Sequence, residues 1–134
     1  MRTRVFFFIV ATFCSFTLMA QSSASFIKKA QQQHGRNEYK EAFESLRNAE
    51  SALYGEERAG SKKMPEVRYN ITQERIQMYI KLRNSKRAKE QLERLEEQTK
   101  TIENDSIAND LLYTQANVYY TFGESTKGDA CINK

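Results

Sequence analysis

The spacing of residues 26–49 limits the possible folds more than any other feature of this chain. Small, aromatic and aliphatic residues recur there at the positions where two neighbouring helices would touch. These residues are Phe26, Ala30, Tyr39, Ala42, Leu46 and Ala49. The triplet Gly35-Arg36-Asn37 interrupts the pattern, and glycine and asparagine favour turns. The stretch therefore predicts a helical hairpin, with helices over residues 23–34 and 38–54.

These six positions resemble the tetratricopeptide repeat, a helix–turn–helix unit of about 34 residues. In that family a bulky residue precedes a small one, and an aromatic, an alanine, a bulky residue and a second alanine follow. Gln33 departs from the pattern, since it stands where the family usually has tyrosine. The resemblance implies an all-α, right-handed solenoid of stacked hairpins. About two and a half to three repeats would follow a cleaved signal peptide.

Two looser units follow the first one, which covers residues 23–54, and they occupy residues 65–102 and 105–134. The matching positions are Ile76, Tyr79, Ala88, Leu92 and Leu95 in the second unit, and Leu112, Ala116, Tyr119 and Ala130 in the third. Ile76 replaces a small residue, Ser85 replaces an aromatic one, and about two extra residues are needed to bring Ala130 into place. An unrelated antiparallel helical bundle is the alternative.

Turn-forming residues predict where the helices begin and end. Gly55 is expected to close the second helix, with a polar loop over residues 56–64. Pro65 is expected to start a helix over residues 65–82 that is apolar on two sides. The candidate N-caps are Asn37, Asn84 or Ser85, and the triplet at residues 104–106, and Gly123 is expected to end the helix over residues 107–122. The last helix, residues 127–134, has no capping helix after it, so the chain is expected to be cut or continued.

The N-terminus has the pattern of a secretory signal peptide, residues 1–20. Arg2 and Arg4 precede an apolar run over residues 5–18 that is too short to span a bilayer comfortably. Cleavage is expected after Ala20, or alternatively after Ala24. The mature protein, residues 21–134, is thus expected to be exported across the inner membrane into the periplasm or another extracytoplasmic space.

Cleavage also changes the charge and the cysteine content. The whole chain has a formal charge of +4, which falls to +2 when Arg2 and Arg4 are removed. Such a small charge does not indicate a nucleic-acid partner. Cys131 becomes the only thiol, so no intrachain disulfide can form, although pairing with another chain is open.

The residues predict neither an enzyme nor a cofactor or metal site. One histidine, His34, and one distant cysteine, Cys131, do not make a nucleophile–base pair or a metal centre. Asp105 is interpreted as a helix-start charge and Asp110 as a surface acid. The densest basic cluster consists of Lys81, Arg83, Lys86, Arg87 and Lys89. We interpret it as the solvated rim of a turn in preference to a site for acidic peptides or anionic surfaces.

The family resemblance supplies a candidate binding site. In tetratricopeptide repeats the first helices line a concave groove in which polar side chains hold a protein or peptide. The corresponding positions here are Gln31, His34, Asn70, Gln73, Gln77, Lys81, Tyr113, Asn117 and Tyr120. Amide side chains suit this role because they both donate and accept hydrogen bonds. For any single position, simple solvent exposure is an equally good interpretation.

The predicted function is an exported module that binds a protein or peptide in this groove. The alternative is the extracytoplasmic sensory domain of a larger membrane-bound bacterial regulator, such as a sensor histidine kinase. Membrane contact would then need a downstream segment, and self-association could occur through the uncapped last repeat. Binding of anionic surfaces or nucleic acid by the basic turn is a weaker hypothesis, and it predicts a steep dependence on salt.

Overall fold

The computed structural model describes residues 21–134, and the predicted signal peptide lies outside the described residues. Six helices make up this part: α2 (Ser23–Gly35), α3 (Tyr39–Gly60), α4 (Pro65–Lys81), α5 (Ser85–Thr99), α6 (Asp105–Thr121) and α7 (Ser125–Ile132). The prediction of an all-α fold is confirmed for residues 21–134, which contain no β-strand. None of these six helices is long and apolar enough to cross a membrane.

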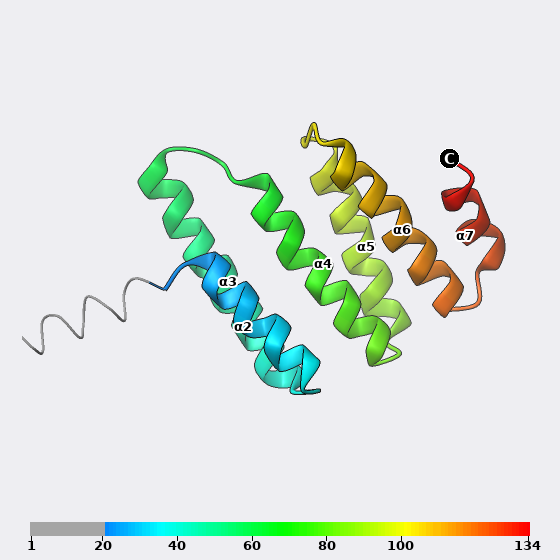
Figure 1. Cartoon of the computed structure of the whole chain (residues 1–134), viewed down its shortest axis with the longest axis horizontal. Coiled ribbons are helices and arrows are strands. Elements are labelled where there is room, and N and C mark those ends of the chain that lie inside the picture. Colours follow the sequence, from blue (N-terminus) through cyan, green and yellow to red (C-terminus); the bar gives the residue numbers. More distant parts are fainter. Residues whose placement is uncertain (1–20) are drawn as a thin grey trace, which may run out of the picture.

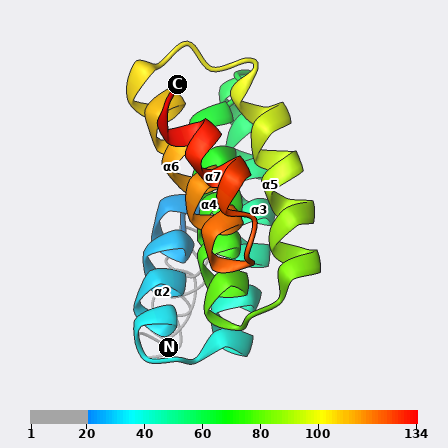
Figure 2. The ribbon, with the colours of Figure 1, turned by 90° about the vertical axis from the view of Figure 1, so that its right-hand side faces the viewer.

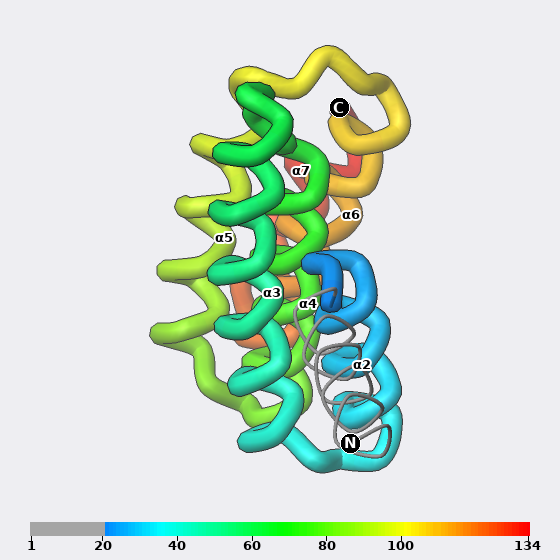
Figure 3. Tube along the Cα trace, turned by 90° about the vertical axis from the view of Figure 1, so that its left-hand side faces the viewer, coloured from blue at the N-terminus to red at the C-terminus, as the bar shows by residue number. Residues whose placement is uncertain are grey.

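The helices pack as three hairpins, α2–α3, α4–α5 and α6–α7, that follow one another along the long axis (Figure 1). The first helices of the hairpins contact in order, α2 with α4 and α4 with α6. The views from the two ends show α2 and α6 on one side of α4 and α3 and α5 on the other (Figures 2 and 3). The first helices therefore lie side by side in one layer.

The same three-residue turn closes all three hairpins. Its central residue has a positive φ in each case, at 61° for Asn37, 57° for Arg83 and 81° for Gly123. The next residue donates its N–H to a carbonyl five residues back: Glu38 to Gln33 at 2.9 Å, Asn84 to Tyr79 at 2.9 Å, and Glu124 to Tyr119 at 2.7 Å. This bond satisfies a carbonyl that the helix end leaves free. Asn37 is thus the left-handed residue of a turn, and its predicted role as an N-cap is wrong.

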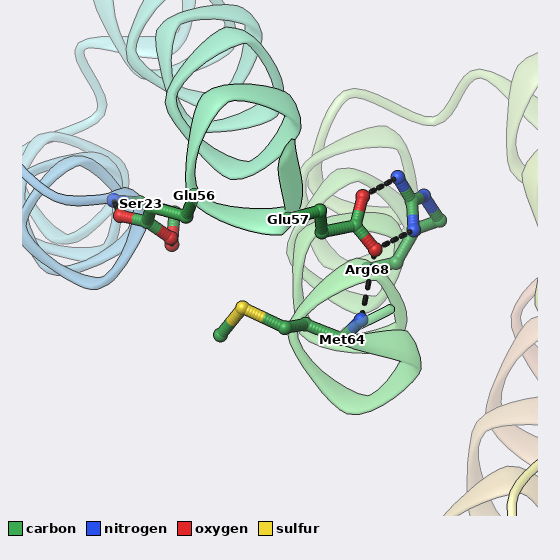
Figure 4. Close-up of polar contacts among 5 residues, drawn as sticks. All are labelled: Ser23, Glu56, Glu57, Met64 and Arg68. Carbon is green, nitrogen blue, oxygen red and sulfur yellow. Dashed lines mark hydrogen bonds and ion pairs between the residues drawn. The ribbon is translucent and has the colours of Figure 1, made fainter. Parts of the chain in front are cut away.

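The predicted end of the second helix at Gly55 is also wrong, because α3 continues to Gly60. A glycine in a helix interior costs only about 1 kcal/mol, so contacts made by the following turn can override it. The turn is anchored on both sides, with Glu56 bound to Ser23 and Glu57 bound to Arg68. Figure 4 shows the two carboxylates pointing in different directions from α3.

Other predicted helix ends are confirmed. Pro65 occupies the start of α4, and Asn84 caps α5 by accepting the N–H of Arg87 at 3.1 Å. Asn104 caps α6 by accepting the N–H of Ser106 at 2.9 Å. The last helix begins at Ser125, two residues before its predicted start.

The core consists of two clusters that share α4. The first joins α2, α3 and α4 through Ile27, Ala30, Ala42, Leu46, Ala49, Leu53, Ile71 and Met78, and the second joins α4, α5 and α6 through Tyr69, Ile76, Leu92, Leu95 and Val118. Ile71 and Ile76, which are both fully buried, lie in different clusters. The prediction that this helix is apolar on two sides is therefore confirmed, and α4 lies between the two clusters.

The third hairpin keeps the register of the first two without extra residues. Ala30 and Ala42 are twelve positions apart, and Ala116 and Gly128 have the same separation. Gly128 is buried, whereas Ala130, the predicted small contact residue, is exposed. A Cβ atom at Gly128 would lie 2.9 Å from the ring of Tyr120, so α7 approaches α6 closely at a position where glycine has no side chain. The assignment of Ala130 to this position is wrong.

Candidate functional site

The nine predicted groove residues all lie on the layer of first helices, α2, α4 and α6. We use the term first-helix face for the polar side of this layer, formed by Gln31, His34, Asn70, Gln73, Glu74, Gln77, Lys81, Asp110, Tyr113, Thr114 and Asn117. Spacings of three and four residues bring these side chains to one side of each helix. Some of them bind one another, and others are uncommitted.

Glu74 joins α2 to α4 on this face. Its Oε1 accepts a hydrogen bond from Nε2 of Gln31 at 3.1 Å, and its Oε2 lies 3.8 Å from Nδ1 of His34. Both predicted α2 residues therefore contact a neighbouring helix. Sequence reasoning missed Glu74, although it is four residues after Asn70 and three before Gln77 and so falls on the same side of α4.

Asp110 joins α4 to α6. It accepts hydrogen bonds from the hydroxyl of Tyr69 and from Nε2 of Gln73, the latter at 3.2 Å. Nε2 of Gln73 also lies 2.6 Å from Oγ1 of Thr114. Burial, together with the bond to Asp110, raises the pKa of Tyr69 above its ordinary value. Asp110 is exposed, as expected for a surface acid, but it also links two helices.

The rest of the face keeps its hydrogen-bonding capacity. Asn70, Gln77, Lys81 and Tyr113 form no side-chain hydrogen bond or ion pair within residues 21–134. The oxygen of the Asn117 amide accepts only a long bond, 3.5 Å from Oγ1 of Thr121. Tyr113 is 69% exposed. In addition, Oε1 of Gln73 is buried without a partner in the described part. Apart from the buried oxygen of Gln73, these groups can receive a polar ligand.

Tyr120 belongs to a different contact. Its hydroxyl donates to Asp129 of α7, and its ring lies over Gly128. The hydrogen bond to Asp129 raises the pKa of Tyr120 above its ordinary value, with desolvation as a second cause. Tyr120, which is one of the nine predicted residues, therefore joins α6 to α7 within the third hairpin.

The described residues contain few other candidate sites. No group of three or more His, Cys, Asp or Glu side chains in residues 21–134 is placed to hold a metal ion. Cys131 is a buried free thiol. In the basic cluster, Arg87 pairs with Glu90 at 3.2 Å and Lys89 with Glu124 at 3.0 Å, as expected for the solvated rim of a turn.

Comparison of the chain with known protein families, with curated proteins and with solved structures found no match. We therefore infer a function from the geometry of the helices and from the chemistry of their exposed side chains.

Proposed function

We propose that this protein binds an extended segment of another polypeptide along the first-helix face. The three hairpins with a common turn and register support a right-handed solenoid of about three units like the tetratricopeptide repeat. In such an arrangement the first helices line one continuous surface. The signal-like pattern at the N-terminus supports export, so we expect the partner to be a periplasmic or other extracytoplasmic protein.

The observation that carries the proposal is one amide at the same register position in every hairpin. Gln31, Gln77 and Asn117 each come directly after the residue at which the two helices of their hairpin meet, Ala30, Ile76 or Ala116. A row of amides matches the alternating N–H and C=O groups of an extended backbone, because each amide can donate and accept. Gln77 and Asn117 are the members of the row that no strong bond from within residues 21–134 occupies.

The bridges between helices favour binding in a second way. Glu74 ties α4 to α2, and Asp110 ties α6 to α4, so neighbouring members of the row are held at fixed positions. A face that is ordered before binding loses less conformational freedom when the ligand arrives. This supports a rigid recognition surface.

Selection from a random peptide library displayed on phage, with the purified protein immobilised, tests the proposal. Selected peptides are then measured against a Gln77→Ala/Asn117→Ala double variant and against Asn48→Ala, which removes an exposed amide from α3. We expect the double variant to lose about tenfold in affinity, because two hydrogen bonds contribute about 0.5–1.5 kcal/mol each. We expect Asn48→Ala to bind as the unmodified protein does.

Two outcomes would contradict the proposal. In one, no peptide sequence is enriched. In the other, the enriched peptides bind the double variant as tightly as the unmodified protein, while circular dichroism shows that both are folded.

A further inference from the structure

The contact between α3 and α4 is filled by two arginine–glutamate pairs. Arg75 of α4 binds Glu50 of α3, and Arg68 binds Glu57 with 2.6 Å between Nη2 and Oε1. Arg75 is 8% exposed and Glu57 is 5% exposed, whereas the side chains of their partners are more than a third exposed, so each pair extends from the interior to the surface. Long aliphatic stems with charged ends therefore occupy this junction.

The contact between α5 and α6 is the equivalent junction of the next two hairpins. The common register aligns Glu50 with Glu96 and Arg75 with Gln115, and Nε2 of Gln115 does donate to Oε1 of Glu96 at 3.0 Å. The same register aligns Arg68 with Ala108. Alanine cannot fill the space that an arginine stem takes, so this part of the junction is left open.

A cavity of about 500 Å³ that is open to the surface lies at this point. Its apolar wall consists of Ile102, Ile107, Ala108, Leu111 and Leu112, and its polar rim consists of Glu96, Thr99, Lys100 and Gln115. The helix α5 has 15 residues where α3 has 22, so no further turn of α5 covers the opening. On α6, residues 108, 112 and 115 lie on the opposite side from residues 113 and 117, so the cavity is separate from the first-helix face.

The rim favours a positive charge. The last turn of α5 carries no basic residue, whereas α3 has Arg58 and α4 has Lys81 at this position. A helix C-terminus has a partial negative charge that a cation stabilises. Glu96 adds a full negative charge. Within residues 21–134 the rim has one cation, Lys100, which is the C-cap residue of α5 and pairs with Glu97 at 2.6 Å in solvent.

We propose that this cavity receives an arginine side chain from a partner polypeptide. Its aliphatic stem would pack against the apolar wall beside Ala108, and its guanidinium would lie at the end of α5 near Glu96. The molecule itself provides the precedent, since Arg68 fills the equivalent position between α3 and α4. That precedent covers the stem, because Arg68 aligns with Ala108, whereas the place of the guanidinium is argued from Glu96 and the end of α5. The contact would be additional to peptide binding on the first-helix face, and it does not depend on that proposal.

Binding is tested with two short peptides of nearly the same size and shape, acetyl-Ala-Arg-Ala-amide and the neutral peptide with citrulline in place of arginine. The readout is the methyl NMR signals of Ile102, Ile107, Leu111 and Leu112 in the purified protein. We expect saturable shifts with the arginine peptide and binding about fivefold weaker or worse with citrulline, since only the charged guanidinium gains from the rim. Absent shifts, or equal binding of the two peptides, would overturn the proposal. Tighter binding of n-butylguanidinium than of the arginine peptide would assign the cavity to a free small molecule and overturn the polypeptide source.

Filling the cavity from within the chain gives a second test. We expect Ala108→Arg to raise Tm by about 3 °C and to abolish the peptide-induced shifts. The matched control is Ala130→Arg, at an exposed position of α7, which should change neither quantity. Peptide binding that survives Ala108→Arg would contradict the proposal.

A further variant, Glu96→Gln, provides a test if Ala108→Arg does not fold. We expect Glu96→Gln to fold, because a glutamine oxygen at this position can still accept the bond from Gln115. We expect this variant to weaken binding of the arginine peptide about threefold or more, and Lys100→Gln to strengthen it. Unchanged binding in both variants would overturn the assignment of the rim.

Discussion

Glu56 and Glu57 are consecutive on α3, yet their carboxylates bind different helices (Figure 4). Glu56 accepts the backbone N–H and the hydroxyl of Ser23, at 2.7 and 2.6 Å, at the start of α2. Glu57 accepts hydrogen bonds from both terminal nitrogens of Arg68, at 2.6 and 3.0 Å, and from the N–H of Met64 at 2.8 Å. The last turns of α3 therefore connect the first hairpin to the second.

Replacing Glu57 by glutamine should destabilise the protein by about 2 kcal/mol near neutral pH. The change leaves the Arg68 guanidinium without its charged partner. Because Glu57 is buried, although the Arg68 side chain is 38% exposed, the cost exceeds that of a surface pair. The matched control is Glu97→Gln, whose partner Lys100 is in solvent, and we expect it to cost less than about 0.5 kcal/mol. Urea unfolding of both variants measures the two values. Equal losses of unfolding free energy in the two variants would show that the pair of Glu57 and Arg68 contributes no more than a surface pair.

The contribution of Glu57 should also depend on pH in one direction. The hydrogen bond from Arg68 lowers the pKa of Glu57 from 4.5 to about 2, with the N–H of Met64 as the second cause. Because the pKa is lower in the folded state, the stabilisation is complete above about pH 5 and is lost as the pH falls toward about 2. We expect the difference in unfolding free energy between the unmodified protein and Glu57→Gln to shrink over that range. A difference in unfolding free energy that stays constant down to about pH 2 would contradict a stabilising role of the ionised Glu57.

Two glycine-to-alanine substitutions should have opposite effects. Gly55 lies inside α3 with nothing within 4 Å of a Cβ atom, so Gly55→Ala should stabilise the protein by about 0.5–1 kcal/mol. Gly123 has a φ of +81°, which an L side chain adopts at a cost, so Gly123→Ala should destabilise it by about 1 kcal/mol or more. Thermal unfolding measures both changes. A loss of stability on Gly55→Ala would mean that α3 bends or ends at this glycine.

Whether Gly128→Ala stabilises or destabilises the protein should depend on the neighbouring side chain of Tyr120. Gly128→Ala places a Cβ atom 2.9 Å from the Tyr120 ring, so we expect a loss of stability and of the bond from Tyr120 to Asp129. In a Tyr120→Ala background the clash is absent, and the same change should stabilise α7 by about 1 kcal/mol through helix propensity. A double-mutant cycle measures the coupling. Additive effects would contradict the close packing of α6 and α7.

Local chemistry made much of the fold predictable from the sequence. Helical periodicity located the helices, and Pro65, Asn84 and Asn104 marked helix starts because their effects are confined to one turn. Gly55 was misleading because its local preference is weak compared with the contacts that Glu56 and Glu57 make with distant residues. Those contacts depend on the tertiary arrangement and leave no local signal in the sequence.

The helix faces of the candidate site could be predicted from the sequence, but the bonds between them could not. Spacing placed Gln31 and Gln73 on the side of their helices that the other candidates share, since period alone decides which side of a helix a residue occupies. It could not reveal that Glu74 and Asp110 would bind them, because each bond joins residues 37 or 43 positions apart. Similarly, the cavity beside Ala108 became visible only when two junctions could be compared in space.

The most direct test of peptide binding is to map the contact on the protein with the tightest peptide from the library. The peptide is titrated into ¹⁵N-labelled protein, and chemical-shift changes are followed for the side-chain amides, which give their own signals. If the peptide lies on the first-helix face, we expect the largest changes at Asn70, Gln77 and Asn117 and small changes at Asn48 on α3. Changes concentrated on α3 and α5, with the first-helix face unaffected, would contradict it.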